Sequence, residues 1–244
     1  MSGRSSGSAT GPASERVRTV PVHEVVRHVY PRPPPEERDH VAMAAGRAID
    51  GTLARFGFEY REGRRPTVGA MRRLGESLFD EGLEEAAVQI PPAEREKILE
   101  QLVAVLQAYR RSPILGLPRP RTRVILIDRS VAVYAQPDYW DGKERIFEMK
   151  SYRAIPPPPD VALQLRLFQL AFPGFETVLL CLNRHVVPVE TVSLIVPPPS
   201  TPEAYEALRA AYDVGREFGE EKILAYMEGP FVHYTLAGGP GGSP

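Results

Sequence analysis

Three charged side chains, Asp138, Glu148 and Lys150, lie in a stretch that otherwise reads as paired β-strands. In the segment QPDYWDGKERIFEMKSY, a polar turn at Asp141-Gly142-Lys143 separates two runs of β-branched and aromatic residues. Side chains two positions apart in a strand point to the same face, so Glu148 and Lys150 are predicted to stand side by side. The turn folds the preceding strand back, which brings Asp138 within reach of Glu148.

This combination of charges predicts a metal-dependent hydrolytic site. Two carboxylates placed together are costly unless a cation lies between them. Mg²⁺ and Mn²⁺ take oxygen ligands from one or two carboxylates and from water. A lysine beside metal-bound water can orient or deprotonate that water, or stabilise negative charge on a phosphate. The alternative is an exposed hairpin with a solvated polar face.

The spacing acid-x-lysine is not specific by itself, because the chain contains it three times. Asp141-Gly142-Lys143 lies in a turn, and Glu220-Glu221-Lys222 lies in a predicted helix. Only Glu148-Met149-Lys150 falls in a predicted strand, and it follows a Pro-Asp pair, Pro137-Asp138, at the end of another strand. Context therefore selects one copy of the three.

Pro137-Asp138 followed by Glu148-Met149-Lys150 resembles the PD-(D/E)XK nuclease superfamily. The arrangement is similar to its RecB-like branch, which includes the CRISPR-associated adaptation nucleases and helicase-linked exonucleases. That branch carries glutamine followed four residues later by tyrosine on a downstream helix; here these positions are Gln164 and Phe168. It also carries a glycine followed by a metal-binding histidine on an upstream helix. The segment AAGRAIDG matches from Gly46, with Asp50 in the histidine position.

The resemblance implies a DNA nuclease that uses Mg²⁺ or Mn²⁺, either an exonuclease or a structure-specific nuclease. The metal ligands would be Asp50, Asp138, Glu148 and the backbone carbonyl of Met149. Lys150 would assist the water, and Gln164 would position Lys150 or the phosphate. The residues expected to contact DNA by stacking or phosphate pairing are Tyr152, Arg153 and Arg166. DNA is the expected partner, and a helicase or another DNA-processing protein is a second one that the sequence leaves open.

The pattern of elements predicts an α/β fold with a restriction-endonuclease-like core, in which helices flank a central mixed sheet, and with an N-terminal helical region. Helical periodicity covers residues 36–58, 67–87 and 93–111, after a short amphipathic segment at 20–30. Runs at 121–128, 131–140 and 144–152 predict a three-stranded meander. A helix at 161–172, strands at 176–183 and 190–196, and a helix from 202 to about 227 follow.

One nuclease domain is expected over residues 17–236, with a helical region at about 36–112 and a catalytic core at about 121–228. The Ser- and Gly-rich ends, residues 1–16 and 237–244, are predicted to be disordered tails. The single cysteine, Cys181, excludes an internal disulfide and a four-thiolate iron–sulfur cluster. The absence of an iron–sulfur cluster separates the chain from the cluster-bearing adaptation nucleases and leaves the hydrolytic site intact. Neither a membrane span nor a signal-peptide core is visible, which predicts a cytoplasmic protein with no membrane partner.

Charge is unevenly distributed along a chain whose formal net charge is −1. Residues 101–127 hold five arginines and no acid, and residues 60–74 hold five arginines against one acid. Residues 201–229 hold seven acids against three bases. This segregation favours one basic face, with charge blocks that keep long helices soluble as the alternative.

Two other classes of function stay open at this stage. One is a catalytically inactive DNA-binding or assembly subunit with a nuclease-like fold. Clustered acid-acid-lysine charges disfavour it, because an abandoned metal site should lose them. The other is a structural scaffold, which predicts no affinity for DNA. The strand polarity of cleavage, the preference for single-stranded, duplex, flap or junction DNA, and the oligomeric state are left open by the sequence.

Overall fold

The computed structural model describes residues 15–33, 36–186 and 188–236. The predicted tails fall outside these residues, except that residues 15 and 16 are described and Arg16 begins a strand. The helices are α1 (Val22–Val29), α2 (Glu37–Arg61), α3 (Val68–Glu85), α4 (Pro92–Tyr109), α5 (Pro159–Ala171), α6 (Thr201–Phe218) and a short 3-10 helix, η1 (Leu224–Tyr226). The strands are β1 (Arg16–Pro21), β2 (Arg123–Ile127), β3 (Val131–Ala135), β4 (Tyr139–Trp140), β5 (Arg145–Lys150), β6 (Glu176–Asn183), β7 (Glu190–Val196), β8 (Glu220–Ile223) and β9 (Phe231–Tyr234). The α/β class is confirmed.

The strands form two mixed sheets. In the first, ordered β4-β5-β6-β7, β5 and β6 are parallel and the other neighbours are antiparallel. The second, ordered β8-β1-β3-β2-β9, joins strands from both ends of the described chain. The strand expected at 131–140 is divided between the two sheets, because β3 ends at Ala135 and β4 begins at Tyr139. Pro137 lies at this break, and proline has no N–H to donate to a sheet ladder.

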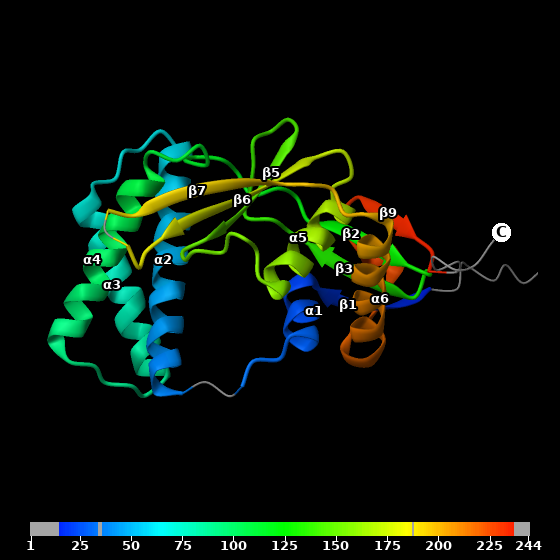
Figure 1. Ribbon diagram of the computed structural model, residues 1–244, viewed down its shortest axis with the longest axis horizontal. Coiled ribbons are helices and arrows are strands. Elements are labelled where there is room, and N and C mark those ends of the chain that lie inside the picture. Colours follow the sequence, from blue (N-terminus) through cyan, green and yellow to red (C-terminus); the bar gives the residue numbers. More distant parts are fainter. Residues whose placement is uncertain (1–14, 34–35, 187, 237–244) are drawn as a thin grey trace, which may run out of the picture.

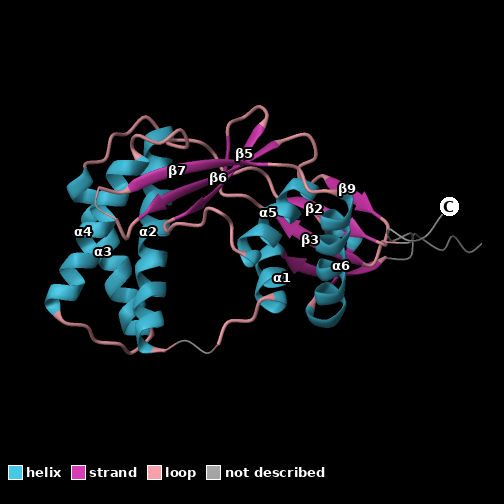
Figure 2. Cartoon of the chain, viewed as in Figure 1, coloured by secondary structure: helices cyan, strands magenta, loops and turns pink. Residues whose placement is uncertain are grey.

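The four-stranded sheet packs against α2, α3 and α4 on one face and against α5 on the other. Figures 1 and 2 show α2, α3 and α4 at one end of the molecule and α5 nearer to the five-stranded sheet. On one face, Phe147 and Met149 of β5 pack in a core with α2, α3 and α4. On the other face, β6 packs against the α5 residues Val161 and Leu165. Since side chains alternate along a strand, Glu148 and Lys150 point away from the α2–α4 core. The helix α5 also packs with α1, α6 and the five-stranded sheet, so it connects the two sheets.

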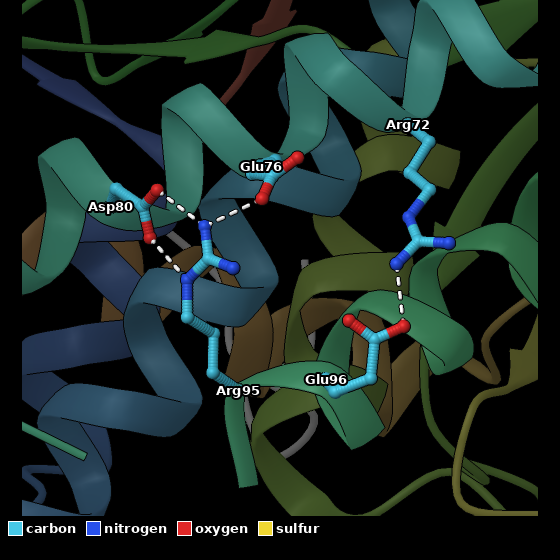
Figure 3. A network of polar contacts seen from close by, with 5 residues as sticks. All are labelled: Arg72, Glu76, Asp80, Arg95 and Glu96. Carbon is cyan, nitrogen blue, oxygen red and sulfur yellow. Dashed lines mark hydrogen bonds and ion pairs between the residues drawn. The ribbon is translucent and has the colours of Figure 1, made fainter. Parts of the chain in front are cut away.

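A network of ion pairs joins α3 to α4 (Figure 3). The guanidinium of Arg95 donates to both oxygens of Asp80, at 2.9 and 2.7 Å, and to Glu76 at 2.7 Å. Arg72 donates to Glu96 at 2.5 Å. Partly exposed pairs of this kind contribute little to stability one by one, but their geometry holds the two helices in register. Both arginines are therefore occupied by carboxylates.

The last helix is shorter than the sequence predicts, since α6 ends at Phe218 and residues 220–223 form β8. Gly219 marks the boundary: a Cβ there would lie 2.4 Å from the carbonyl oxygen of Gly215, so a larger residue would not fit. The charged residues of β8 pair with β1 at the edge of the five-stranded sheet. Charged side chains are typical of edge strands. The prediction of a helix to residue 227 was wrong because residues 220–223 pair with β1. That strand lies about 200 residues earlier in the chain, so the local sequence carries no signal of the pairing.

Candidate active site

The carboxylate of Asp138 is held against β5 by a hydrogen bond from the backbone of that strand. Its Oδ2 accepts a hydrogen bond from the N–H of Met149 at 2.9 Å. The antiparallel register pairs Tyr139 with Phe147, which places Asp138 opposite Glu148 in the hairpin. The predicted approach of the two carboxylates is therefore present in the structure.

Lys150 connects β5 to α5. Its Nζ donates to Oε1 of Glu148 at 2.7 Å and to Oε1 of Gln164 at 3.0 Å. The buried face of α5 holds the helix against the sheets and aims Gln164 at the lysine. Gln164 thus belongs to the polar cluster rather than being an isolated core amide.

Burial and like charge dominate the electrostatics of Glu148. The residue is 4% exposed. Desolvation and then the charge of Asp138 raise the pKa of Glu148 to about 8, although Lys150 opposes the rise. Burial alone would lower the pKa of Lys150, but the charge of Glu148 and the hydrogen bond to it outweigh that effect and raise the pKa. A lysine whose pKa is raised in this way is better suited to act as a cation than as a general base.

Asp50 approaches the same cluster from the middle of α2. Its side chain reaches solvent, but enough protein surrounds it that desolvation is the main cause that raises its pKa to about 6. The charge of Asp138 adds to the rise, whereas Lys150, Arg184 and Arg119 oppose it. Asp50 on α2 therefore lies within electrostatic range of both Asp138 and Lys150.

Two arginines flank this acidic centre and were not assigned to it from the sequence. Arg184 directly follows β6, and its Nη2 lies 3.5 Å from the carbonyl oxygen of Ala42 on α2. Arg119 comes from the loop before β2, and its charge, like that of Arg184, opposes the rise in the pKa of Asp50. Neither belongs to a motif. The position of Arg184 at the end of the strand beside β5 is the one sequence signal that could have indicated it.

The donor set suits a hard divalent cation. Asp50, Asp138 and Glu148 offer only oxygen ligands, and burial, followed by the charge of Asp138, raises the pKa of both Asp50 and Glu148. Within residues 15–33, 36–186 and 188–236, however, no three acidic, histidine or cysteine side chains converge closely enough to hold a metal ion. Glu148 is instead engaged by Lys150.

The residues expected to contact DNA have different surroundings. Arg166 pairs with Glu203 at 2.5 Å and so connects α5 to α6. Tyr152 is half-buried and packs with the small core between α5 and β6. Arg153 is exposed just after β5. Only Tyr152 and Arg153 lie within three residues of Lys150 along the chain.

Comparisons with known proteins name no family. No protein-family model matches the chain, and no curated protein matches it. One solved structure, "Crystal structure of SSO0001", has 13% sequence identity and a TM-score of 0.37, with 83% of this chain and 78% of that chain covered. Within the described part of the chain, none of the helices has the length and apolar character needed to cross a membrane.

Proposed function

We propose that this protein is a metal-dependent nuclease that hydrolyses phosphodiester bonds in DNA. The observation that carries the proposal is the cluster around β5, where Lys150 is bonded to both Glu148 and Gln164 and Asp138 is bonded to the next peptide. These are the residues in which the sequence resembles the RecB-like branch of PD-(D/E)XK nucleases. The hydrogen bonds among these residues support the proposal independently of the resemblance.

Asp138 and Glu148 would hold Mg²⁺ or Mn²⁺, together with Asp50 and the carbonyl oxygen of Met149. When bound, such an ion polarises the phosphoryl oxygen and lowers the pKa of a bound water. The bond from the Met149 N–H fixes one oxygen of Asp138 and hence the orientation of the carboxylate. The protein therefore supplies an oriented acid on one side of the site and the buried Glu148 on the other.

Lys150 would act as a positioned cation. Gln164 holds its ammonium in place from α5, and Glu148 does so from β5. In the reaction, the oxygen of water forms a bond to phosphorus, the bond from phosphorus to the leaving oxygen breaks, and the leaving oxygen takes up a proton in exchange for the one that the water releases. A fixed ammonium stabilises the negative charge that develops on the phosphate and orients the attacking water.

A second candidate is an inactive subunit that binds DNA or organises an assembly. Two observations favour it: in the described residues no three ligand side chains converge, and Lys150 occupies an oxygen of Glu148. In that case the ion pair would replace the metal permanently. The two candidates differ in whether a divalent cation can compete with Lys150 for Glu148.

The test is incubation of 5′- and 3′-labelled single-stranded, duplex and flapped DNA with Mg²⁺, Mn²⁺, Ca²⁺ or chelator. The nuclease predicts cleavage with Mg²⁺ or Mn²⁺, and DNA binding without turnover in Ca²⁺, whose looser coordination positions water poorly. The inactive subunit predicts binding in all four conditions and cleavage in none. Cleavage in excess chelator would contradict the metal mechanism.

A further inference from the structure

Two arginine-rich stretches that are far apart in the sequence meet at the C-terminal end of α2. Nη1 of Arg61 donates to the carbonyl oxygen of Leu117 at 2.9 Å. A Cβ at Gly116 would lie 2.9 Å from Cδ1 of Tyr60, so the loop after α4 passes directly against the last turn of α2. Segments 61–65 and 110–119 therefore form one surface, here called the arginine surface: Arg61, Arg65, Arg110, Arg111 and Arg119, all exposed.

These arginines differ in their partners from Arg72 and Arg95 of the helical layer. Arg65 donates to the carbonyl oxygens of Tyr60 and Arg64, and Arg111 donates to that of Gln107. Across the described residues, no member of the arginine surface forms an ion pair with a carboxylate. Arg72 and Arg95, by contrast, are held by acids of the α3–α4 network (Figure 3). The arginine surface thus keeps its positive charge available.

The arginine surface is continuous with the acidic centre along α2. Asp50, Ala54, Phe58 and Arg61 are exposed and follow one another at helical spacing on one side of the helix. Arg61 lies eleven positions after Asp50, a distance of about 16 Å at the rise of an α-helix. Phe58 is 40% exposed between them, with the guanidiniums of Arg55, Arg61 and Arg64 at 5.7–5.9 Å from its ring centroid. Arg119 lies two residues after Leu117, whose carbonyl oxygen accepts from Arg61, and its charge opposes the rise in the pKa of Asp50.

We infer that the arginine surface binds the phosphate backbone of the DNA that enters the active site. The inference rests on the proposed function for the direction in which the DNA runs. About 16 Å corresponds to about five base pairs of duplex, so the contacts would lie several nucleotides from the bond that is cleaved. Guanidiniums without carboxylate partners are suited to phosphates. The acid-rich stretch 201–229, which forms α6 and β8, would repel DNA from that other part of the molecule.

The experiment compares the wild type with the double variant Arg65→Gln/Arg111→Gln. Glutamine removes the charge and retains a hydrogen-bond donor, and both residues lie outside the catalytic cluster. The matched control is Arg72→Gln, which removes an arginine that Glu96 already neutralises. Fluorescence anisotropy measures the binding of fluorescein-labelled duplex and single-stranded DNA in Ca²⁺ at several NaCl concentrations. Each DNA is several times longer than the span of about five nucleotides. Hydrolysis of bis(p-nitrophenyl) phosphate in Mn²⁺ reports on the catalytic centre alone.

The double variant should reduce the slope of log affinity against log salt by about 1.8 on duplex or about 1.4 on single strands, since each lost phosphate contact contributes about 0.9 or 0.7. The control should keep the wild-type slope, and all three proteins should hydrolyse the small ester equally. A double variant with wild-type affinity and slope on both DNAs would overturn the inference and assign the surface to another partner. Failure of the wild type to hydrolyse either the ester or DNA would instead refute the proposed function, while a lost salt slope would still support the surface.

Discussion

The ammonium of Lys150 lies 2.7 Å from the carboxylate of Glu148, two residues earlier on the same face of β5. The carboxylate belongs to a residue that is 4% exposed. Burying such a pair is weak support for stability, because well-packed apolar residues of the same volume often stabilise a protein as much or more. Gln164 adds a second bond to the ammonium at 3.0 Å. The burial of this pair, which is held by residues of β5 and α5, is therefore better explained by a role in the proposed reaction than by a contribution to the stability of the fold.

The first prediction concerns how stability depends on pH. The pKa of Glu148 is raised from 4.5 to about 8 in the folded protein. Between these values the unfolded chain has released the proton that the folded chain retains, so the free energy of unfolding falls as pH rises, by at most about 1.4 kcal/mol per pH unit. Glu148→Gln removes this dependence. In chelator, the melting temperature of the variant relative to wild type should increase from pH 5 to pH 8.

Melting curves at half-unit steps of pH measure that difference, and groups that titrate in both proteins cancel from it. Glu81→Gln, which changes an exposed acid on α3, serves as the control for the loss of a carboxylate. A flat difference for Glu148→Gln would show that the buried carboxyl ionises normally.

The second prediction is that Asp138→Asn, Glu148→Gln and Lys150→Met each reduce DNA cleavage by more than about 100-fold and leave the fold intact. Asparagine at 138 still offers an oxygen to the Met149 N–H, so the hairpin should be retained. Gel assays in Mg²⁺ and Mn²⁺ measure cleavage, and circular dichroism measures folding. Near-wild-type cleavage by any one of the three would remove that residue from the site.

The third prediction separates Gln164 from the rest of α5. Gln164→Met keeps the length of the side chain but loses the acceptor for Lys150, so kcat should fall about 10- to 100-fold with KM little changed. Gln169→Met is the matched control, because Gln169 lies on the same helix and donates to the carbonyl oxygens of Val196 and Pro197. The control should reduce melting temperature without a comparable loss of kcat. Equal effects on kcat would mean that Gln164 only stabilises the helix.

The cluster around β5 could be predicted from the sequence because its members are close in the chain. Asp138, Glu148 and Lys150 belong to one hairpin, so strand alternation and turn position were enough to bring them together. Gln164 lies on the next helix and was indicated only by the resemblance to the RecB-like branch. The contacts of Lys150 with Glu148 and Gln164 agree with those expectations. The metal and the reaction stay predictions.

Long-range pairing could not be predicted in the same way. The sequence gives no local signal that β1 pairs with β3 and β8, or β9 with β2, and these contacts create a second sheet. They also convert residues 220–223 from predicted helix to strand. The positions of Arg119 and Arg184 near Asp50 were missed for the same reason. The sequence marked Arg119 only as one of five arginines in residues 101–127, and both residues acquire their neighbours only through tertiary packing.

The last prediction turns on Asp50, where the chain departs from the family that it resembles. A carboxylate in place of imidazole makes the expected ligands all oxygen, which favours Mg²⁺, whereas an imidazole favours Mn²⁺ and later transition metals. Asp50→His should therefore shift cleavage toward Mn²⁺, and Asp50→Asn should weaken Mn²⁺ binding about 10-fold or more. Calorimetric titration with Mn²⁺ measures affinity independently of activity, and Glu81→Gln again controls for the loss of an exposed acid. If Asp50 is only a surface acid on α2, both variants will bind metal and cleave DNA as the wild type does, and the ligand set will reduce to Asp138, Glu148 and the Met149 carbonyl.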